Sequence, residues 1–183
     1  GYLQIVKGEA YKERSERNVL EEAIIFADRG IIYDRNRVEL AWNNKEDGAE
    51  FPSRAYKGPG FSHVLGYVSY PAKDEKGVYW RTDYIGQDGL EKEYDEMLRG
   101  KNGAKIIEVD ASKTVHSENI VNTPERGREL VTTIDSRIQT ELFKLIQNLS
   151  RSNSFTGGAG VILDVHSGEI NVATSYPEYN TEI

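Results

Sequence analysis

Three histidines, His63, His116 and His166, are the residues best able to do acid–base chemistry or bind a metal. None has a second histidine or an acid at a zinc-binding spacing such as His-Glu-x-x-His. The chain has no cysteine, which excludes a disulfide, a thiolate nucleophile and a cysteine-bound metal. We interpret the histidines as strand-end or turn residues and expect no catalytic residue, metal or cofactor. A small hydrolase that pairs His63 or His116 with an acid is the enzyme alternative, although no motif supports it.

The composition limits the class of partner. The chain has 183 residues, of which 38% are hydrophobic and 29% charged, as in a globular protein. Its net charge is −7 and it has no basic block, which argues against nucleic acid binding. No apolar run approaches the roughly 18–20 residues that a membrane-spanning helix needs.

The chain is organised around residues 86–103, where glycines enclose one predicted helix. Asp88 is placed to cap its first turn, and Glu91 to reach back as in a capping box. The spacing of one set of apolar residues predicts a buried stripe: Leu90, Tyr94, Met97 and Leu98. The glycines expected to shape the helix are Gly86, Gly89 and Gly100, the last by turning the chain away.

A second amphipathic helix and a hairpin follow. Asp135 is predicted to cap the helix, and Gln139 lies near its start. Five residues are expected on its packed side: Ile138, Leu142, Leu145, Ile146 and Leu149. Residues 159–165 and 169–174 are predicted to pair across a turn that contains Gly168.

The rest of the chain is predicted to form short strands and polar loops. A charged helix is expected at 8–18, and loops at 43–57 and 71–77. Residues 61–70 fit either a strand or a short helix. Strands are expected at 23–26, 29–35, 38–41 and 130–134, with 105–110 pairing antiparallel with 118–121.

Alternating charges surround the apolar stretch at 31–33: Asp28, Arg29, Asp34 and Arg35. Such residues either form exposed ion pairs, which contribute little, or include a partly buried arginine that holds two segments together. The sequence leaves these two interpretations open. Gly30 is expected to permit a bend or bulge.

Four stretches in this order resemble a known family. They are RGIIYDRN (29–36), the region from HVLGYV to IGQDGLEKEYDEMLRGKNG (63–103), LVTTIDSRIQ (130–139) and GAGVILDVHSGEINVATSYPEYN (158–180). Together they resemble the N-terminal, non-catalytic region of class B penicillin-binding proteins, most closely those of the elongation type, penicillin-binding protein 2.

The resemblance implies an elongated α+β pedestal module with short antiparallel strands and two main amphipathic helices. It also implies that the parent protein is a membrane-anchored D,D-transpeptidase, which cross-links peptidoglycan through an acyl-serine outside the bacterial cytoplasmic membrane. The transpeptidase motifs Ser-x-x-Lys and Lys-Ser/Thr-Gly are not in this sequence. The chain itself is therefore expected not to be an enzyme.

The family pattern suggests three parts. Residues 1–22 would be a charged juxtamembrane helix or linker, 23–157 the pedestal, and 158–183 the hairpin that begins the transpeptidase domain. Two departures stand out: Arg37 replaces a glycine usual in the family, and the polar loop before HVLGYV replaces a sizeable head subdomain, which is reduced or absent.

The expected function is to position a catalytic domain on the extracytoplasmic, periplasmic side of the membrane. The family implies a SEDS-type glycosyltransferase and cell-wall scaffold proteins as partners, and it allows a homodimer. The alternative is a free-standing extracytoplasmic module that binds peptidoglycan or protein. The residues expected to have structural roles are Arg29, Gly30, Asp34, Arg35, Gly86, Gly89, Glu91, Gly100, Asp135 and Gln139.

Overall fold

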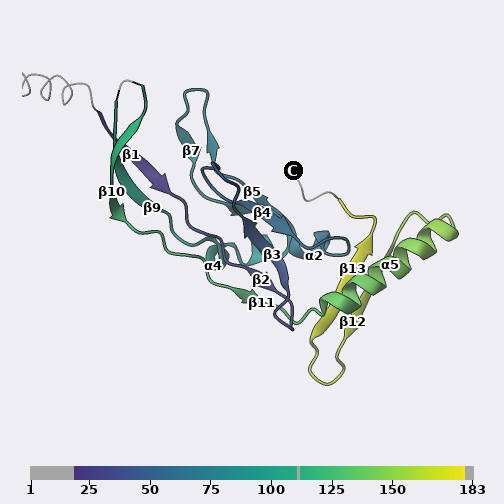
Figure 1. Ribbon diagram of the computed structural model, residues 1–183. Helices are drawn as coiled ribbons and strands as arrows, with labels where there is room; N and C mark the ends of the chain where they lie inside the picture. Colours follow the sequence, from purple (N-terminus) through teal and green to yellow (C-terminus); the bar gives the residue numbers. More distant parts are fainter. Residues whose placement is uncertain (1–18, 111, 180–183) are drawn as a thin grey trace, which may run out of the picture. The chain divides into compact units, whose positions relative to one another are not determined.

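The computed structural model describes residues 19–110 and 112–179 (Figure 1). The chain divides into two compact units, one formed by residues 1–25 and 102–124 and the other by residues 26–101 and 125–183. Short antiparallel strands occur in both, and the helices of the described residues all belong to the second. The predicted α+β class is confirmed.

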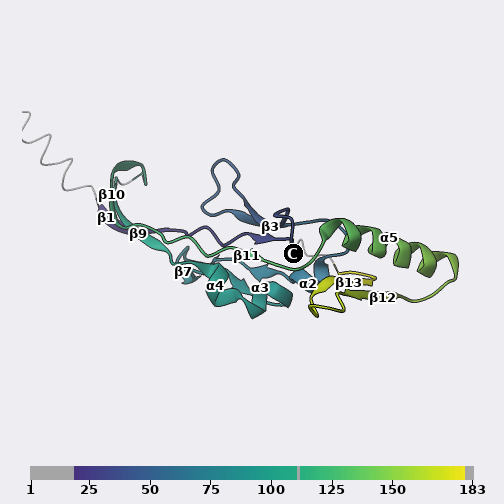
Figure 2. The same ribbon diagram turned by 90° about the horizontal axis from the view of Figure 1, so that it is seen from below.

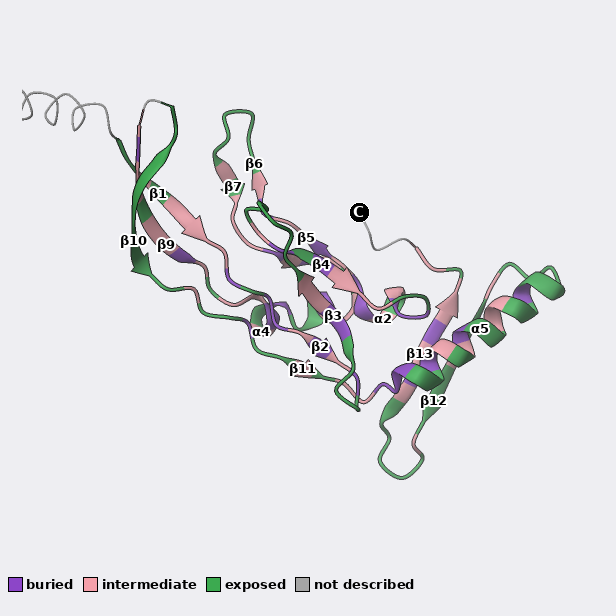
Figure 3. Ribbon diagram, viewed as in Figure 1, coloured by how far each residue is buried: buried purple, intermediate pink, exposed green. Residues whose placement is uncertain are grey.

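The first unit is a three-stranded antiparallel sheet with the order β1-β9-β10. Its strands are β1 (Val19–Ile25), β9 (Gly103–Val109) and β10 (Val115–Asn122). The predicted pairing of 105–110 with 118–121 is confirmed, and β1 begins four residues before the predicted strand at 23–26. β10 is exposed along its whole length (Figure 3). The charged helix predicted at 8–18 lies outside the described residues.

The second unit is built on a four-stranded sheet with the order β11-β2-β3-β4. Its strands are β2 (Ile32–Tyr33), β3 (Glu39–Asn44), β4 (Ser53–Tyr56) and β11 (Leu130–Val131). β11 runs parallel to β2, and the other neighbours are antiparallel. The strand predicted at 130–134 is shorter because the Thr132 hydroxyl donates to Tyr33 O and accepts from Ile134 N, which turns the chain toward the next helix.

The hydrophobic core of this unit lies where the sheet meets the short helices. Its buried residues are Ile32, Leu40, Ala41, Phe61, Leu65, Leu98 and Ile134. They come from β2, β3, the region of α2 (Ser62–Leu65), α4 (Asp95–Arg99) and the segment before α5 (Ser136–Ser152). Segments far apart in the sequence therefore share one core. Burial of this apolar surface is the main force that joins them.

Two predicted loops contain strands. The polar segment 43–57 was predicted as a loop, but it includes the end of β3 and all of β4, which pair with each other. This polar segment can form a strand because the charged Arg54 side chain is buried and paired, with Glu91 Oε1 and Gly30 O. The segment 71–77 is the turn region of a small hairpin formed by β6 (Ala72–Lys73) and β7 (Tyr79–Arg81).

Residues 61–70, for which helix and strand were both open, contain one of each. The helix α2 (Ser62–Leu65) precedes β5 (Val68–Ser69), and β5 pairs with β8 (Ile85–Gly86).

The single helix predicted after Asp88 is wrong in two respects. It is two short helices, α3 (Gly89–Glu93) and α4 (Asp95–Arg99), separated at Tyr94. Asp88 takes the position before α3, but its side chain makes no capping bond. The capping box fails because the Glu91 carboxylate is buried and bound to arginines from distant segments. Of the predicted stripe, Leu98 is in the core while Tyr94 is exposed.

The helix α5 (Ser136–Ser152) lies along the hairpin formed by β12 (Gly158–Leu163) and β13 (Ile170–Tyr176) (Figure 2). The hairpin prediction is confirmed, and Gly168 has the expected positive φ of 76°. The predicted packed side of α5 is only partly right: Ile138, Leu145 and Leu149 are exposed, whereas Gln139 and Phe143 are buried. The helix therefore has apolar residues on two sides, one that is buried and one that is exposed.

Candidate functional site

A buried cluster of two arginines and one glutamate joins three segments of the second unit. Arg29 Nε donates to Glu91 Oε2 at 2.6 Å, and Arg54 Nε donates to Glu91 Oε1 at 2.8 Å. The three side chains have no exposed surface. Arg29 Nη2 also donates to the main-chain oxygen of Glu91 at 2.9 Å. One carboxylate thus bridges the segment before β2, strand β4 and helix α3.

Asp95 on α4 completes the cluster and balances its charge. Its Oδ1 lies 2.8 Å from Arg29 Nη2 and accepts from Gly86 N at 2.8 Å. Asp95 also pairs with Arg99 on the same helix. Burial alone raises the pKa of this carboxyl, but the hydrogen bonds from Gly86 and Arg99 and the charge of Arg29 outweigh it and lower the pKa. Two buried arginines therefore face two carboxylates.

Close backbone approach explains two of the glycines singled out in the sequence. A Cβ on Gly86 would lie 1.9 Å from Glu91 O, and a Cβ on Gly30 would lie 1.9 Å from Arg128 O. Gly30 N donates to Leu98 O at 2.7 Å, and Gly30 O accepts from Arg54 Nη2 at 2.8 Å. These glycines let the main chain pack directly against the cluster.

Gly89 and Gly100 combine close packing with positive φ. Gly89 has φ of 55°, and a Cβ there would lie 2.5 Å from Val64 O. Gly100 has φ of 73°, and a Cβ there would lie 2.5 Å from Glu125 O. A residue with a side chain is unfavourable at both positions.

Asp34 links the turn after β2 to the start of α5. Its Oδ1 accepts from Asn36 N and Val38 N, and its Oδ2 accepts from the Ser136 hydroxyl at 2.7 Å. Burial favours the neutral acid, but these bonds outweigh it and lower the pKa of Asp34. Neighbouring Arg35 is exposed and donates to Asn171 Oδ1 at 2.5 Å. The alternating charges at 28–35 thus divide between buried positions, Arg29 and Asp34, and exposed ones, Asp28 and Arg35.

Asp135 and Gln139 fix the first turn of α5. Asp135 Oδ1 accepts from Arg137 N at 3.1 Å and Ile138 N at 3.4 Å. The Arg137 side chain is the main reason that the pKa of Asp135 falls to about 2. Buried Gln139 donates through Nε2 to Gly60 O at 2.8 Å and accepts from Ala173 N at 3.0 Å. One amide therefore connects α5, the loop before α2 and strand β13.

The histidines make separate local contacts. His63 Nδ1 lies 2.9 Å from Ser175 Oγ, and His116 Nε2 lies 2.8 Å from Asp110 Oδ2 on the other unit. Within 19–110 and 112–179 no carboxylate bonds to His63 to orient it as a general base. The same residues contain no group of three acids or histidines able to hold a metal.

Sequence reasoning missed Arg54, Asp95 and Ser136, which complete the contacts of Arg29 and Asp34. Arg54 lay in a segment predicted as a loop, and Asp95 lay in the predicted helix within 86–103 but outside its apolar stripe. No local pattern in the sequence indicates these contacts, because the partners of Arg29 and Asp34 come from distant segments.

The described residues contain no helix that is both long and apolar enough to cross a lipid bilayer.

Comparison with known proteins gives a consistent result. Residues 47–132 match the family model of the "Penicillin-binding Protein dimerisation domain". The chain is 25% identical over 259 aligned residues to the peptidoglycan D,D-transpeptidase MrdA of Acinetobacter baumannii, with the whole chain aligned to 38% of that protein. It thus spans well under half the length of this relative.

Solved structures share the fold. Penicillin-binding protein 2X of Streptococcus thermophilus superposes with a TM-score of 0.70 at 20% identity, covering 88% of this chain and 36% of that one. The penicillin-binding protein 2 of Helicobacter pylori, solved as a complex with MreC, superposes with a TM-score of 0.62 at 24% identity, covering 89% and 44%.

Proposed function

Because this chain carries a penicillin-binding protein dimerisation domain at residues 47–132 and resembles the non-catalytic region of class B penicillin-binding proteins, we propose that it positions the catalytic domain of a peptidoglycan D,D-transpeptidase. In this role the chain performs no acyl transfer itself. It serves cell-wall synthesis on the periplasmic side of the cytoplasmic membrane, as a rigid part of a longer, membrane-anchored protein.

The observation that carries this proposal is a set of uncovered apolar side chains on α5 and on the β12–β13 hairpin. The side chains of Leu145 and Leu149 are 59% and 58% exposed, and Val161 on β12 is 61% exposed. Further exposed apolar residues of the same helix–hairpin pair are Ile138, Ile162, Leu163 and Ile170. No described segment covers them. Exposed apolar side chains gathered on one helix–hairpin pair are expected to pack against another folded part, which we assign to the catalytic domain.

The contacts around the loop before α2 support a positioning role. Glu178, just after β13, accepts from Gly60 N and Ser62 N, both at 2.8 Å. Tyr179 donates to Ser62 O at 2.9 Å, and Thr174 on β13 donates to Gly60 O at 3.0 Å. Together with Gln139, these bonds fasten the helix–hairpin pair to the core of the second unit. A domain packed against the helix–hairpin pair would therefore be held in a fixed orientation.

The partners proposed for the whole protein follow the family. They are a SEDS-type glycosyltransferase and a cell-wall scaffold protein, and the H. pylori relative solved with MreC supports the second. A homodimer is a further proposal, suggested by the name of the domain that matches.

Covalent labelling with penicillin tests the proposal. The 183-residue chain should show no mass increase after incubation with labelled penicillin, whereas the longer protein encoded by the gene should gain one penicilloyl group, because the acylated serine lies in the catalytic domain. An adduct on the 183-residue chain would contradict the non-catalytic role.

Reading the gene beyond the codon for Ile183 separates this function from its alternative. A frame that continues to Ser-x-x-Lys and Lys-Ser/Thr-Gly motifs would support the positioning role. A stop codon at that point would instead favour a free-standing module that binds peptidoglycan or protein.

A further inference from the structure

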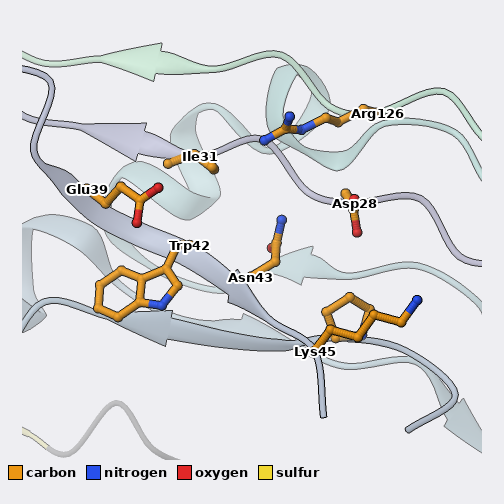
Figure 4. A pocket seen from close by; sticks show the side chains of 8 residues that line it. Asp28, Ile31, Glu39, Trp42, Asn43, Lys45 and Arg126 are labelled. Carbon is orange, nitrogen blue, oxygen red and sulfur yellow. The ribbon is translucent and has the colours of Figure 1, made fainter. Parts of the chain in front are cut away.

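A groove of about 310 Å³ opens on the surface of the second unit beside strand β3 (Figure 4). Its apolar lining is formed by Ile31, Trp42 and Pro52. Four charged side chains also line it: Asp28, Glu39, Lys45 and Arg126. Figure 4 shows Glu39 and Trp42 toward one end of the groove, and Asp28, Lys45 and Arg126 toward the other.

Among the described residues, the charged groups that line the groove are unpaired, unlike those of the buried cluster beneath it. In the buried cluster, Arg29 and Arg54 both pair with Glu91, and nearby Lys101 pairs with Glu125 at 3.0 Å. Within the described part of the chain, the four charged side chains of the groove make no ion pair and no side-chain hydrogen bond, and neither does the indole N–H of Trp42. Their charges and donor are thus available to a ligand.

The floor of the groove is fixed in advance by Asn43. Its Nδ2 donates to Arg29 O at 2.7 Å, and its Oδ1 accepts from Arg54 Nη1 at 3.0 Å. This amide ties β3 to the buried arginine cluster directly under the groove. A rigid floor lowers the entropy cost of binding, because little has to be ordered when a ligand arrives.

The lining selects a ligand class. An indole with an apolar surround and a charged rim is the usual composition of a protein-binding surface. A neutral glycan would leave charges of both signs without partners, and a nucleic acid would meet two carboxylates as well as a net charge of −7. A polypeptide with an apolar side chain between a basic and an acidic residue satisfies all three features.

We propose that the groove along Trp42 docks an extended segment of a partner protein, with a basic residue at Glu39, an apolar residue on Trp42 and an acidic residue at Arg126 and Lys45. This inference rests on the proposed function, since it gives the positioning module a docking site for one partner. Its test measures binding alone, so it fails or succeeds independently of penicillin labelling.

Trp42 can report binding directly. Trp80 is the other tryptophan, so the Trp80→Phe variant leaves Trp42 as the only indole. The probes are blocked pentapeptides with a Val-Leu-Val centre and the ends Lys and Glu in both directions, together with the Lys–Lys and Glu–Glu versions and the neutral sugar chitotriose. We expect the Lys/Glu peptides to change Trp42 fluorescence at millimolar concentration or below, in a way that weakens with salt.

Charge reversal makes the test specific. Arg126→Glu should weaken binding of the Lys/Glu peptides about tenfold and shift preference to the Lys–Lys peptide, while Glu39→Lys should shift preference to the Glu–Glu peptide. Both residues are exposed, so the fold should persist. Lys76→Glu, in the β6–β7 turn, is the control and should change nothing.

Three outcomes would overturn the proposal. They are the absence of a Trp42 response to every peptide, equal binding of all charge versions, and a response to chitotriose that matches or exceeds the response to the peptides. The last would identify the groove as a glycan site instead.

Discussion

Arg29 and Glu91 lie 62 positions apart in the sequence, yet their side chains meet at 2.6 Å with no exposed surface on either. This bond, with the matching one from Arg54, places a charged centre between β4, α3 and the segment before β2. Such a centre contributes less to net stability than its contacts suggest, because burying charge is costly. Its effect is to permit only one arrangement of the three segments.

Removal of the central carboxylate should therefore be strongly destabilising. Glu91→Gln leaves two buried arginines facing a neutral amide, and we expect the free energy of unfolding to fall by about 3–5 kcal/mol. Denaturant titration measures this change. Glu93→Gln, on the exposed side of the same helix, is the matched control and should stay within about 0.5 kcal/mol of the unmodified protein. Equal stability of the two variants would contradict the structural role of the cluster.

Gly89 offers a second test, of backbone geometry. Valine at this position would combine a positive φ of 55° with a Cβ 2.5 Å from Val64 O, so we expect a loss of about 1–3 kcal/mol or more and a lower melting temperature. Gly58→Val is the control, because Gly58 has open space around its Cβ position and no positive φ. Equal melting temperatures of the two variants would contradict the close packing of Gly89 in the turn before α3.

These two positions also show what sequence can reveal. The glycines at 89 and 100, which have positive φ, and the cap at Asp135 were predictable because backbone conformation and capping are local properties. The partner of Glu91 was not, since a capping box looks equally good in the sequence and the competing arginines come from distant segments. Arg54 was missed because its surrounding polar residues resemble a loop.

The helix α5 illustrates a different limit. The spacing of its apolar residues predicted a helix, and a helix forms there. The spacing shows which residues share one side of the helix, but not which segment, if any, packs against that side. Leu145 and Leu149 are exposed in this part of the protein, while the polar Gln139 is buried because it bonds two main-chain groups. Which face is packed depends on neighbours that the pattern does not name.

The acid limb of stability should depend on Asp135. Its pKa in the folded protein is about 2, below the ordinary 3.8, chiefly because of the Arg137 side chain. The charged form therefore stabilises the fold above about pH 4, and this contribution disappears as the pH falls toward 2. Asp135→Asn keeps a capping side chain but should flatten the loss of stability over this range. Unfolding measured at a series of pH values checks this, with exposed Asp47→Asn as the control that should keep the slope.

Gln139 should be essential to the attachment of the helix–hairpin pair. Gln139→Leu keeps the approximate volume but removes the bonds to Gly60 O and Ala173 N, and we expect a loss of about 1–3 kcal/mol. Gln147→Leu is the control on the same helix: among the described residues the Gln147 side chain makes no hydrogen bond, so this variant should be nearly neutral. Amide hydrogen exchange should also rise around Gly60 in the first variant alone. Unchanged exchange there would indicate that the amide does not connect these segments.

The uncovered face of α5 leads to a prediction about the 183-residue chain by itself. Because Leu145 and Leu149 are more than half exposed, a hydrophobic dye such as ANS should bind the folded chain. Leu145→Gln with Leu149→Gln should reduce dye binding, while stability changes by less than about 1 kcal/mol, since neither side chain is in the core. Phe143→Ala is the contrasting variant. Because Phe143 is buried, this substitution should lower the free energy of unfolding by about 3–5 kcal/mol. In the longer protein that we propose, the double glutamine variant should instead lower stability, because there the catalytic domain would cover these side chains. If it has no effect in the longer protein, another surface carries that domain and the positioning role assigned to α5 is wrong.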